Sequence, residues 1–277
     1  MNPSNHVVAS NNSLVVYTRE GKVATITLNK PGRLNAFDAD LVVSLKHALR
    51  RFDEDQEAEA AVIVGEGRAF SSGADVQKRQ CRTPEEFERL GGPQEPDAHS
   101  GDLLVRSVRW KPVIASVHGH VLGLALGIAF ESDLIVAEEG TKFQITETPR
   151  GLGGARYWVL LHFCGAPAFA TEVALTGRFF TAEEAMDAGV VCRVAPRGTY
   201  LQAAQDLARQ IAENPPLSVR ATVRARRWFM DQFEREIAAQ TEPLRLYLTE
   251  DFREAVQAFV EKRPHAQFSG RNCTENN

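Results

Sequence analysis

Strand patterns and helix patterns alternate along residues 14–195, and only helix patterns follow them. Runs rich in β-branched residues predict strands at 14–17, 23–28, 61–64, 112–117, 134–137, 142–145 and 190–194. Helical spacing of apolar residues, together with capping residues, predicts helices at 38–52, 123–130, 157–163 and 181–189, and again from residue 200 onward. This order predicts an α/β fold with a core at 13–198, an all-helical C-terminal region at 199–277 and a flexible N-terminus at 1–12.

Two turns framed by glycine, at 70–75 and 118–124, each connect a predicted strand to a predicted helix. Backbone N–H groups are unpaired at such a junction, and the helix dipole adds partial positive charge. Two turns of this kind that face each other can stabilise one developing oxyanion. The turns therefore suggest enolate or acyl chemistry on a carbonyl compound, with plain turn geometry as the alternative explanation of the glycines.

The overall composition excludes several classes of protein. The 277 residues carry a net charge of -4, so there is no basic footprint of the kind that binds nucleic acid. The longest apolar run, 121–130, contains two glycines and is too short to span a membrane, and the first residues lack the features of a signal peptide. Four scattered cysteines form no Cys-x-x-Cys pair, which predicts reduced thiols in a cytoplasmic protein and no metal site.

Eight short motifs follow one another along the chain: RLNA at 33–36, FSSGADV at 70–76, KPVIA at 111–115, GHVLG at 119–123, SD at 132–133, LTG at 175–177, AEEAMDAG at 182–189 and FVEKR at 259–263. Together they resemble the crotonase family, which is the enoyl-CoA hydratase/isomerase group, over about residues 14–268. The resemblance implies a spiral of repeated ββα units whose C-terminal helical region packs in homotrimers or dimers of trimers. It also implies a coenzyme A thioester as the substrate, with no separate cofactor.

The resemblance further assigns roles to single residues. It places the two oxyanion donors on the backbone N–H groups of Ala74 and Leu124. Because Leu124 stands where a second glycine is usual, its side chain is expected to add bulk beside the thioester. Contacts with the substrate or its coenzyme A are implied for these two residues and for Arg33, Leu34, Asp75, Val76 and Lys262. The residues alone leave two alternatives open, a helix cap for Asp75 and a solvated helix charge for Lys262.

One expected carboxylate is present and the other is missing. Hydratases of the family use two glutamates, and the corresponding positions here are Gly127 and Glu147. Adding water calls for one group that activates it and another that handles the α-proton, whereas a single carboxylate is enough to move a double bond. We therefore expect Δ3–Δ2 enoyl-CoA isomerisation with Glu147 as the base. Enoyl-CoA hydration, carbon–carbon cleavage or hydrolysis, and acyl-CoA binding without catalysis are the alternatives.

Two charged residues are candidate accessories to Glu147. Glu131 lies one helical turn beyond Gly127 and is either a replacement carboxylate or a structural glutamate. Arg150 lies three residues after Glu147. It either holds Glu147 ionised, binds a carboxylate on the substrate tail, or points to solvent or another subunit.

Two further segments carry predictions of their own. The polar segment 77–101 predicts a loop with one short helix after Thr83, and this loop is either a lid or a surface insertion. The basic cluster at 224–227 predicts a subunit interface or a solvated face. The neighbouring Trp228 and Phe229 are expected in the core.

Overall fold

The strands of the computed structural model, which describes residues 13–93, 103–164 and 167–271, form two sheets. The larger sheet has the order β1-β2-β3-β4-β6-β9, and the smaller one has the order β5-β7-β8. The strands are β1 (Val15–Glu20), β2 (Val23–Leu28), β3 (Ala60–Gly65), β4 (Val113–Val117), β5 (His120–Leu122), β6 (Leu134–Glu138), β7 (Lys142–Gln144), β8 (Phe179–Thr181) and β9 (Arg193–Ala195). Strands β1 and β2 form an antiparallel hairpin, and the remaining neighbours in the larger sheet are parallel.

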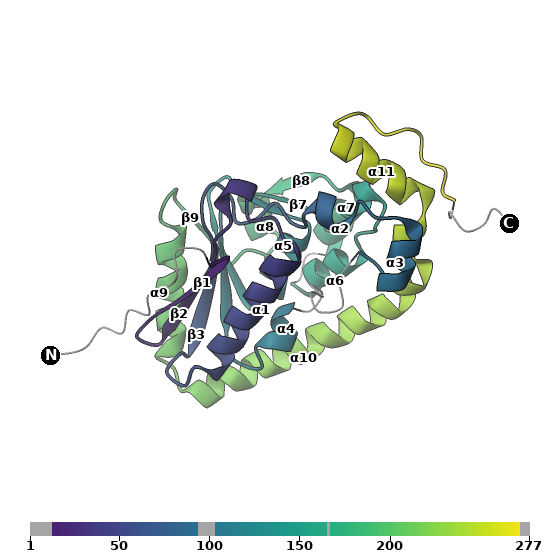
Figure 1. Cartoon of the computed structure of the whole chain (residues 1–277). Coiled ribbons are helices and arrows are strands. Elements are labelled where there is room, and N and C mark those ends of the chain that lie inside the picture. Colours follow the sequence, from purple (N-terminus) through teal and green to yellow (C-terminus); the bar gives the residue numbers. More distant parts are fainter. Residues whose placement is uncertain (1–12, 94–102, 165–166, 272–277) are drawn as a thin grey trace.

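Helices cover both faces of the larger sheet (Figure 1). The α-helices of the described residues are α1 (Ala39–Glu54), α2 (Val76–Arg79), α3 (Pro84–Leu90), α4 (Leu103–Ser107), α5 (Leu124–Glu131), α6 (Ala155–Phe163), α7 (Pro167–Thr176), α8 (Ala182–Asp187), α9 (Tyr200–Ala212), α10 (Pro216–Thr241) and α11 (Glu250–Glu261). Among the described residues, no helix combines the length and the apolar character that crossing a membrane requires.

Strand β3 shows why the sheet needs helices on both sides. All six of its residues are buried. Ala61 and Ile63 belong to the main apolar cluster, which also contains the apolar face of α1. Ala60 and Val62 point the other way, into a second cluster built with α9. Successive side chains of a strand face opposite sides, so both faces of this parallel sheet must be covered.

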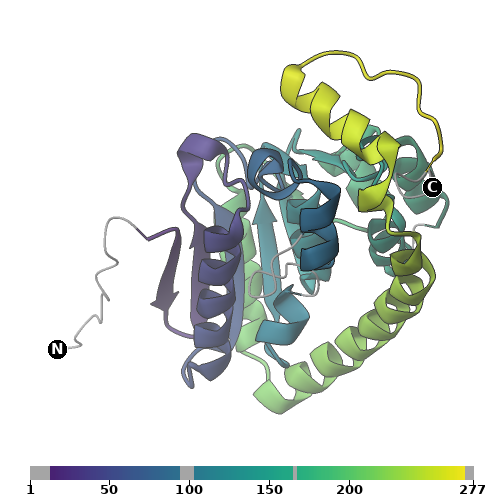
Figure 2. The same cartoon turned by 45° about the vertical axis from the view of Figure 1, so that its right-hand side comes forward.

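The chain repeats one local unit. After β4 it adds β5 to the smaller sheet and then forms α5, and after β6 it adds β7 to the smaller sheet before forming α6. These are the predicted ββα units. The C-terminal helices are arranged differently, because α10 runs away from the sheet and α11 turns back over α2 and the segment after β7 (Figure 2).

Several elements were not predicted from the sequence. These are β5, β8, α4 and α7. Strand β5 lies within the second glycine turn, and β8 ends at the N-cap of α8, so turn and cap signals dominate both segments. The predicted strand at 190–194 is wrong in position, since β9 begins at Arg193. Helix α9 lies within the predicted C-terminal region but packs on β3, β4 and β6.

The segment 77–101 and the N-terminus extend outside the described residues. The predicted short helix after Thr83 is present as α3 and has a capping box formed by Thr83 and Glu86. Residues 94–101 of the predicted loop, and the predicted flexible N-terminus at 1–12, lie outside the part that the structure describes.

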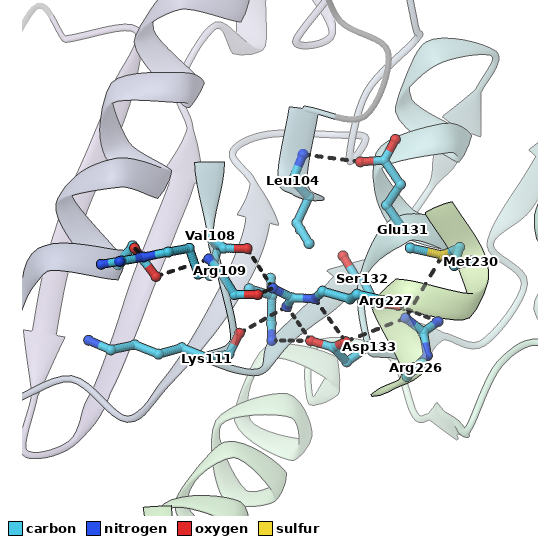
Figure 3. A network of polar contacts seen from close by, with 12 residues as sticks. Leu104, Val108, Arg109, Lys111, Glu131, Ser132, Asp133, Arg226, Arg227 and Met230 are labelled. Atoms are coloured by element: carbon cyan, nitrogen blue, oxygen red, sulfur yellow. Dashed lines mark hydrogen bonds and ion pairs between the residues drawn. The ribbon is translucent and has the colours of Figure 1, made fainter. Parts of the chain in front are cut away.

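The structure contradicts the solvated-face alternative for two arginines of the cluster and the core prediction for the two aromatic residues that follow it. Arg226 and Arg227 bind the core through Asp133, so they are not solvated charges (Figure 3). Trp228 and Phe229 are 57% and 53% exposed. The reason is that α10 buries only a narrow stripe along its 26 residues, and the two aromatic side chains lie outside it.

Candidate active site

The first glycine turn is held by the segment that precedes α1. Asn35 is fully buried, and its Nδ2 donates to the carbonyl oxygens of Ala69 and Phe70, each at 3.0 Å. Its own carbonyl accepts from Ser71 Oγ at 2.7 Å. Asn35 was not among the predicted functional residues, and only its place in the 33–36 motif signals it. Its contacts fix the backbone conformation of the turn.

Phe37 continues this contact into the turn itself. Its N–H donates to the carbonyl of Gly73 at 2.8 Å, and its carbonyl accepts from the N–H of Asp75 at 2.9 Å. The N–H of Ala74 lies between these two bonds and takes part in neither. The loop before α1 thereby leaves the Ala74 N–H available.

The second turn lies directly against the first. Ser71 N–H donates to the carbonyl of His120 at 3.1 Å, and Leu122 N–H donates to the carbonyl of Ser71 at 3.2 Å. Gly73 has a φ of +85°, and a Cβ there would lie 2.4 Å from the carbonyl oxygen of Leu122 and 3.5 Å from the N atom of Leu124. Only glycine fits at this contact, so the two turns meet because Gly73 has no side chain.

Two backbone donors remain without partners at this junction. In residues 13–93, 103–164 and 167–271, neither Ala74 N–H nor Leu124 N–H donates a hydrogen bond. Leu124 is the first residue of α5, where N–H groups have no partner within the helix. Its side chain is 8% exposed and packs in the main apolar cluster. The unusual backbone angle belongs to Gly123, whose φ is +50°.

The carboxylate of Glu147 lies beside the second turn. A Cβ on Gly123 would lie 3.0 Å from Glu147 Oε1. Tyr157 Oη donates to Oε1 at 2.8 Å, and Thr146 Oγ1 donates to Oε2 at 3.3 Å. Burial raises the pKa of Glu147 above its ordinary value, while the bond from Tyr157 and the charge of Arg150 act in the opposite direction.

The space beside Gly127 is filled by side chains of α6. A Cβ on Gly127 would lie 2.6 Å from Arg156 Nη1 and 3.2 Å from Tyr157 Cε1. A guanidinium and a phenol ring therefore occupy the place from which a second carboxylate would project.

Glu131 is fully buried and is bound from two sides. It forms an ion pair with Arg156, and its Oε2 accepts from the N–H of Leu104 at 3.1 Å (Figure 3). Arg156 Nε also lies 3.0 Å from Glu234 Oε1. This arrangement agrees with the structural alternative for Glu131.

Four of the residues predicted to contact coenzyme A lie together near the first turn. Arg33 Nη2 is 3.7 Å from Asp75 Oδ2, and Leu34 accepts from Ser72 N–H at 2.9 Å. Asp75 caps α2, which agrees with the cap alternative, and Val76 is the first residue of that helix. Lys262 lies apart from them as the exposed C-terminal cap of α11.

Arg150 packs against its own chain. Its guanidinium carbon is 4.1 Å from the ring centroid of Phe259 on α11, a cation–π contact. Burial lowers the pKa of Arg150 from its ordinary value, and the charge of Glu147 raises it. Arg150 forms no ion pair with a carboxylate among the described residues.

Two cavities lie beside the C-terminal helices, and the lining of neither includes Ala74, Leu124 or Glu147. One of about 350 Å³ lies between α3 and α11 and is lined mainly by apolar side chains, including Phe87, Phe252 and Val256. The other, of about 480 Å³, lies between α6 and α10 and includes Leu152 and Arg156. The described part of the chain contains no cluster of three or more His, Cys, Asp or Glu residues that could hold a metal ion.

Comparisons with known proteins point to one family and one fold. A model of the enoyl-CoA hydratase/isomerase family matches residues 18–271. A 2,3-dehydroadipyl-CoA hydratase of Escherichia coli is 30% identical over 270 residues, which cover 94% of this chain and 100% of that protein. A carnitinyl-CoA dehydratase of Salmonella heidelberg is 32% identical over 259 residues, which cover 89% of this chain and 95% of that protein. The crystal structure of an enoyl-CoA hydratase from Mycobacterium avium subsp. paratuberculosis has a TM-score of 0.75 at 23% identity, covers 92% of this chain and 99% of its own, and confirms the predicted fold.

Proposed function

The chain belongs to the enoyl-CoA hydratase/isomerase family, and we propose that it moves the double bond of an enoyl-CoA thioester between carbons 3–4 and carbons 2–3. One observation carries this choice within the family. The position of the second carboxylate is a glycine, and the space beside it is filled by Arg156 and Tyr157. Among the described residues, Glu147 therefore provides the carboxylate beside the second glycine turn, and no carboxylate projects from position 127.

In this proposal the two free backbone donors bind the thioester oxygen. Ala74 N–H and Leu124 N–H lie on adjoining turns and have no other partner in the described residues. When a proton leaves the acyl chain, negative charge develops on the carbonyl oxygen, and preorganised donors stabilise it. The N-terminus of α5 adds partial positive charge at the same place.

Glu147 moves the proton. Its carboxylate takes the proton from carbon 2, next to the thioester carbonyl, and the electron pair of that bond enters the dienolate. The protonated Glu147 then returns the proton to carbon 4, which leaves the double bond between carbons 2 and 3, so substrate and product have the same composition. The raised pKa of Glu147 suits this work, because a stronger base is a better match for a weakly acidic C–H bond.

Hydration is the second candidate. The curated relatives include proteins named hydratase and dehydratase. In this reaction Glu147 alone would have to activate the water and handle the α-proton.

The two candidates are separated by incubating the purified protein with 3-enoyl-CoA and with 2-enoyl-CoA. We expect 3-enoyl-CoA to be converted to the conjugated isomer without a change in mass. Addition of one water to 2-enoyl-CoA, without isomerisation, would support hydration instead. If neither substrate reacts, both candidates are excluded, and carbon–carbon cleavage or hydrolysis and acyl-CoA binding without catalysis are the alternatives left.

The coenzyme A contacts and the assembly are part of the same proposal. Arg33, Leu34, Asp75 and Val76 are proposed to contact coenzyme A near the first turn, and Lys262 its nucleotide end. A homotrimer or dimer of trimers is supported by the apolar side chains that α10 leaves exposed, among them Phe229 and Phe233. Light scattering on the purified protein would measure the assembly.

A further inference from the structure

We propose that Tyr157 is the positioning residue of the base, holding Glu147 by one oxygen and leaving the other to carry the proton. This inference rests on the proposed role of Glu147. Tyr157 comes from α6, ten residues after the carboxylate that it binds, and is 6% exposed. Tyr157 belongs to none of the sequence motifs that carry the family resemblance.

The glycine at 127 and the ring of Tyr157 depend on each other. The ring edge lies 3.2 Å from where a Cβ of Gly127 would be, which is closer than an ordinary van der Waals contact. A glutamate at 127 would have to displace the ring or the neighbouring Arg156. The absence of a side chain at Gly127 thereby makes room for the phenol of Tyr157, which binds Glu147.

Tyr157, and not Arg156, is the group that acts on Glu147. Arg156 is shared between Glu131 and Glu234, so two carboxylates already neutralise its charge. Tyr157 Oη is 2.8 Å from Glu147 Oε1, and burial together with the charge of Glu147 raises the pKa of Tyr157 well above its ordinary value. The hydroxyl therefore stays protonated over the working pH range and acts as a donor.

The two oxygens of Glu147 are not equivalent. Oε1 accepts the 2.8 Å bond from Tyr157, whereas Oε2 accepts the 3.3 Å bond from Thr146. A carboxylic acid carries its proton on one oxygen only. Because Oε1 is occupied by a donated hydrogen, the C–H bond breaks with formation of an O–H bond at Oε2. That bond breaks again when the proton returns to the acyl chain.

Few other charges influence this carboxylate. Arg150 in the 3₁₀ helix η3 (Thr148–Arg150) lowers its pKa, and Glu131 of α5 is paired with Arg156. On the elements packed against η3, Glu172 of α7 pairs with Arg178. Asp251 of α11 accepts from the N–H groups of residues 269 and 270.

The test is Tyr157→Phe, which removes only the hydroxyl. We expect kcat to fall about tenfold to a hundredfold, with KM within about twofold, because the lost bond was made to a charged group. The acid limb of the pH–rate profile should move to higher pH, since Glu147 loses a donor that favours its ionised form. Thr146→Val should move the limb in the same direction by less, because its bond is longer.

Tyr17→Phe is a matched control. Tyr17 Oη donates to Asp55 Oδ2 at the same 2.8 Å, and Tyr17 is 7% exposed. This variant loses an equivalent tyrosine–carboxylate bond on β1, and we expect its kcat and pH profile to match those of the unchanged protein. Circular dichroism of all three variants would establish that they are folded.

Carbon-13 NMR of the Glu147 carboxyl, assigned with Glu147→Gln, gives the pKa without turnover. We expect a higher pKa in Tyr157→Phe and no change in Tyr17→Phe. An unchanged pKa in Tyr157→Phe would overturn the inference whatever happens to kcat. Failure of the unchanged protein to isomerise 3-enoyl-CoA would instead overturn the proposed function, and the NMR titration would still decide the role of Tyr157.

Discussion

At the scale of single residues, the chemistry of the site depends on what surrounds Glu147. Burial favours its neutral form, while Tyr157, Thr146 and Arg150 favour the charged form. The net effect is a raised pKa, which keeps the group a base while making it a stronger one. Arg156 forms its ion pairs with Glu131 and Glu234.

The first prediction concerns the pH dependence of the unchanged protein. Glu147 must be ionised to act as a base, so kcat/KM should rise with pH through its raised pKa. We expect the midpoint of this acid limb above 4.5, the ordinary value for glutamate. A limb at or below that value would contradict the burial of the charge, and the measurement is a pH–rate profile with 3-enoyl-CoA.

Replacing the base gives the second prediction. Glu147→Gln keeps the shape of the side chain and should lower kcat about a hundredfold to ten-thousandfold, the usual range for a lost general base. The exposed Glu172, on α7, offers Glu172→Gln as a control that should leave kcat unchanged. Full activity in Glu147→Gln would remove Glu147 from the mechanism.

The third prediction concerns the missing carboxylate. Gly127→Glu should not produce hydratase activity by itself, because the introduced carboxylate would meet Arg156 and the ring of Tyr157. The double variant Gly127→Glu with Arg156→Ala removes that competing cation and makes space. Mass spectrometry of 2-enoyl-CoA after incubation would detect added water, and hydration by the single variant would contradict the blocking role of Arg156.

At the scale of elements, the site is assembled by short segments that fix one another's ends. Asp38 is an example, because it caps α1 by accepting from Leu41 N–H at 3.2 Å. It also pairs with Lys30 and with Lys78 of α2, each at 2.7 Å. One carboxylate thus connects the helix after the first loop to the helix after the first glycine turn.

The fourth prediction tests that connection. Asp38→Ala should lower the free energy of unfolding by about 1–2 kcal/mol through the lost cap. Asp40→Ala, at an exposed position in the first turn of α1, should stay within about 0.5 kcal/mol. Chemical denaturation measures both, and equal losses in the two variants would show that the cap contributes nothing.

The loss of stability in Asp38→Ala should depend on pH. Burial raises the pKa of Asp38, but the bonds from Lys30 and Lys78 outweigh it and hold the pKa below the ordinary 3.8. A lowered pKa in the folded state stabilises the protein above the unfolded value, and the gain is lost as the pH falls. The difference between Asp38→Ala and the unchanged protein should therefore shrink as the pH is lowered through 3.8.

At the scale of the whole molecule, Arg227 joins three segments that are far apart in the sequence (Figure 3). It is 3% exposed and donates to the carbonyls of Val108 at 2.8 Å and Lys111 at 2.9 Å. Its ion pair with Asp133 is 2.6 Å long, and Asp133 also accepts from the N–H of Val113 at the start of β4. This network attaches α10 to the larger sheet.

The fifth prediction follows from that burial. Arg227→Met should lower the free energy of unfolding by about 3–5 kcal/mol, because it leaves the Asp133 charge and two carbonyls without their main donor. Arg226→Met should cost less, since Arg226 is more exposed and lies 3.4 Å from Asp133. Denaturant titration compares the two, and equal small losses would contradict the anchoring role of Arg227.

Much of the architecture could be predicted because it is encoded locally. The hairpin, the cap at Asp38 and the capping box at Thr83 are each visible within a few residues. Strands β5 and β8 were missed because β5 lies within the second glycine turn and β8 ends at the N-cap of α8, so turn and cap signals dominate both segments. Trp228 and Phe229 were misplaced because hydrophobicity alone does not tell which side of a helix is covered.

The sequence by itself determined the family, the two turns with their N–H groups, and the presence of one carboxylate where the family resemblance implies two. Only the tertiary structure decided what replaces the second carboxylate, because Arg156 and Tyr157 reach Gly127 from another helix. It also decided that Tyr157 binds Glu147 and that Arg227 binds Asp133. Such contacts join residues whose separation along the chain follows no helical or strand period, so no local pattern records them.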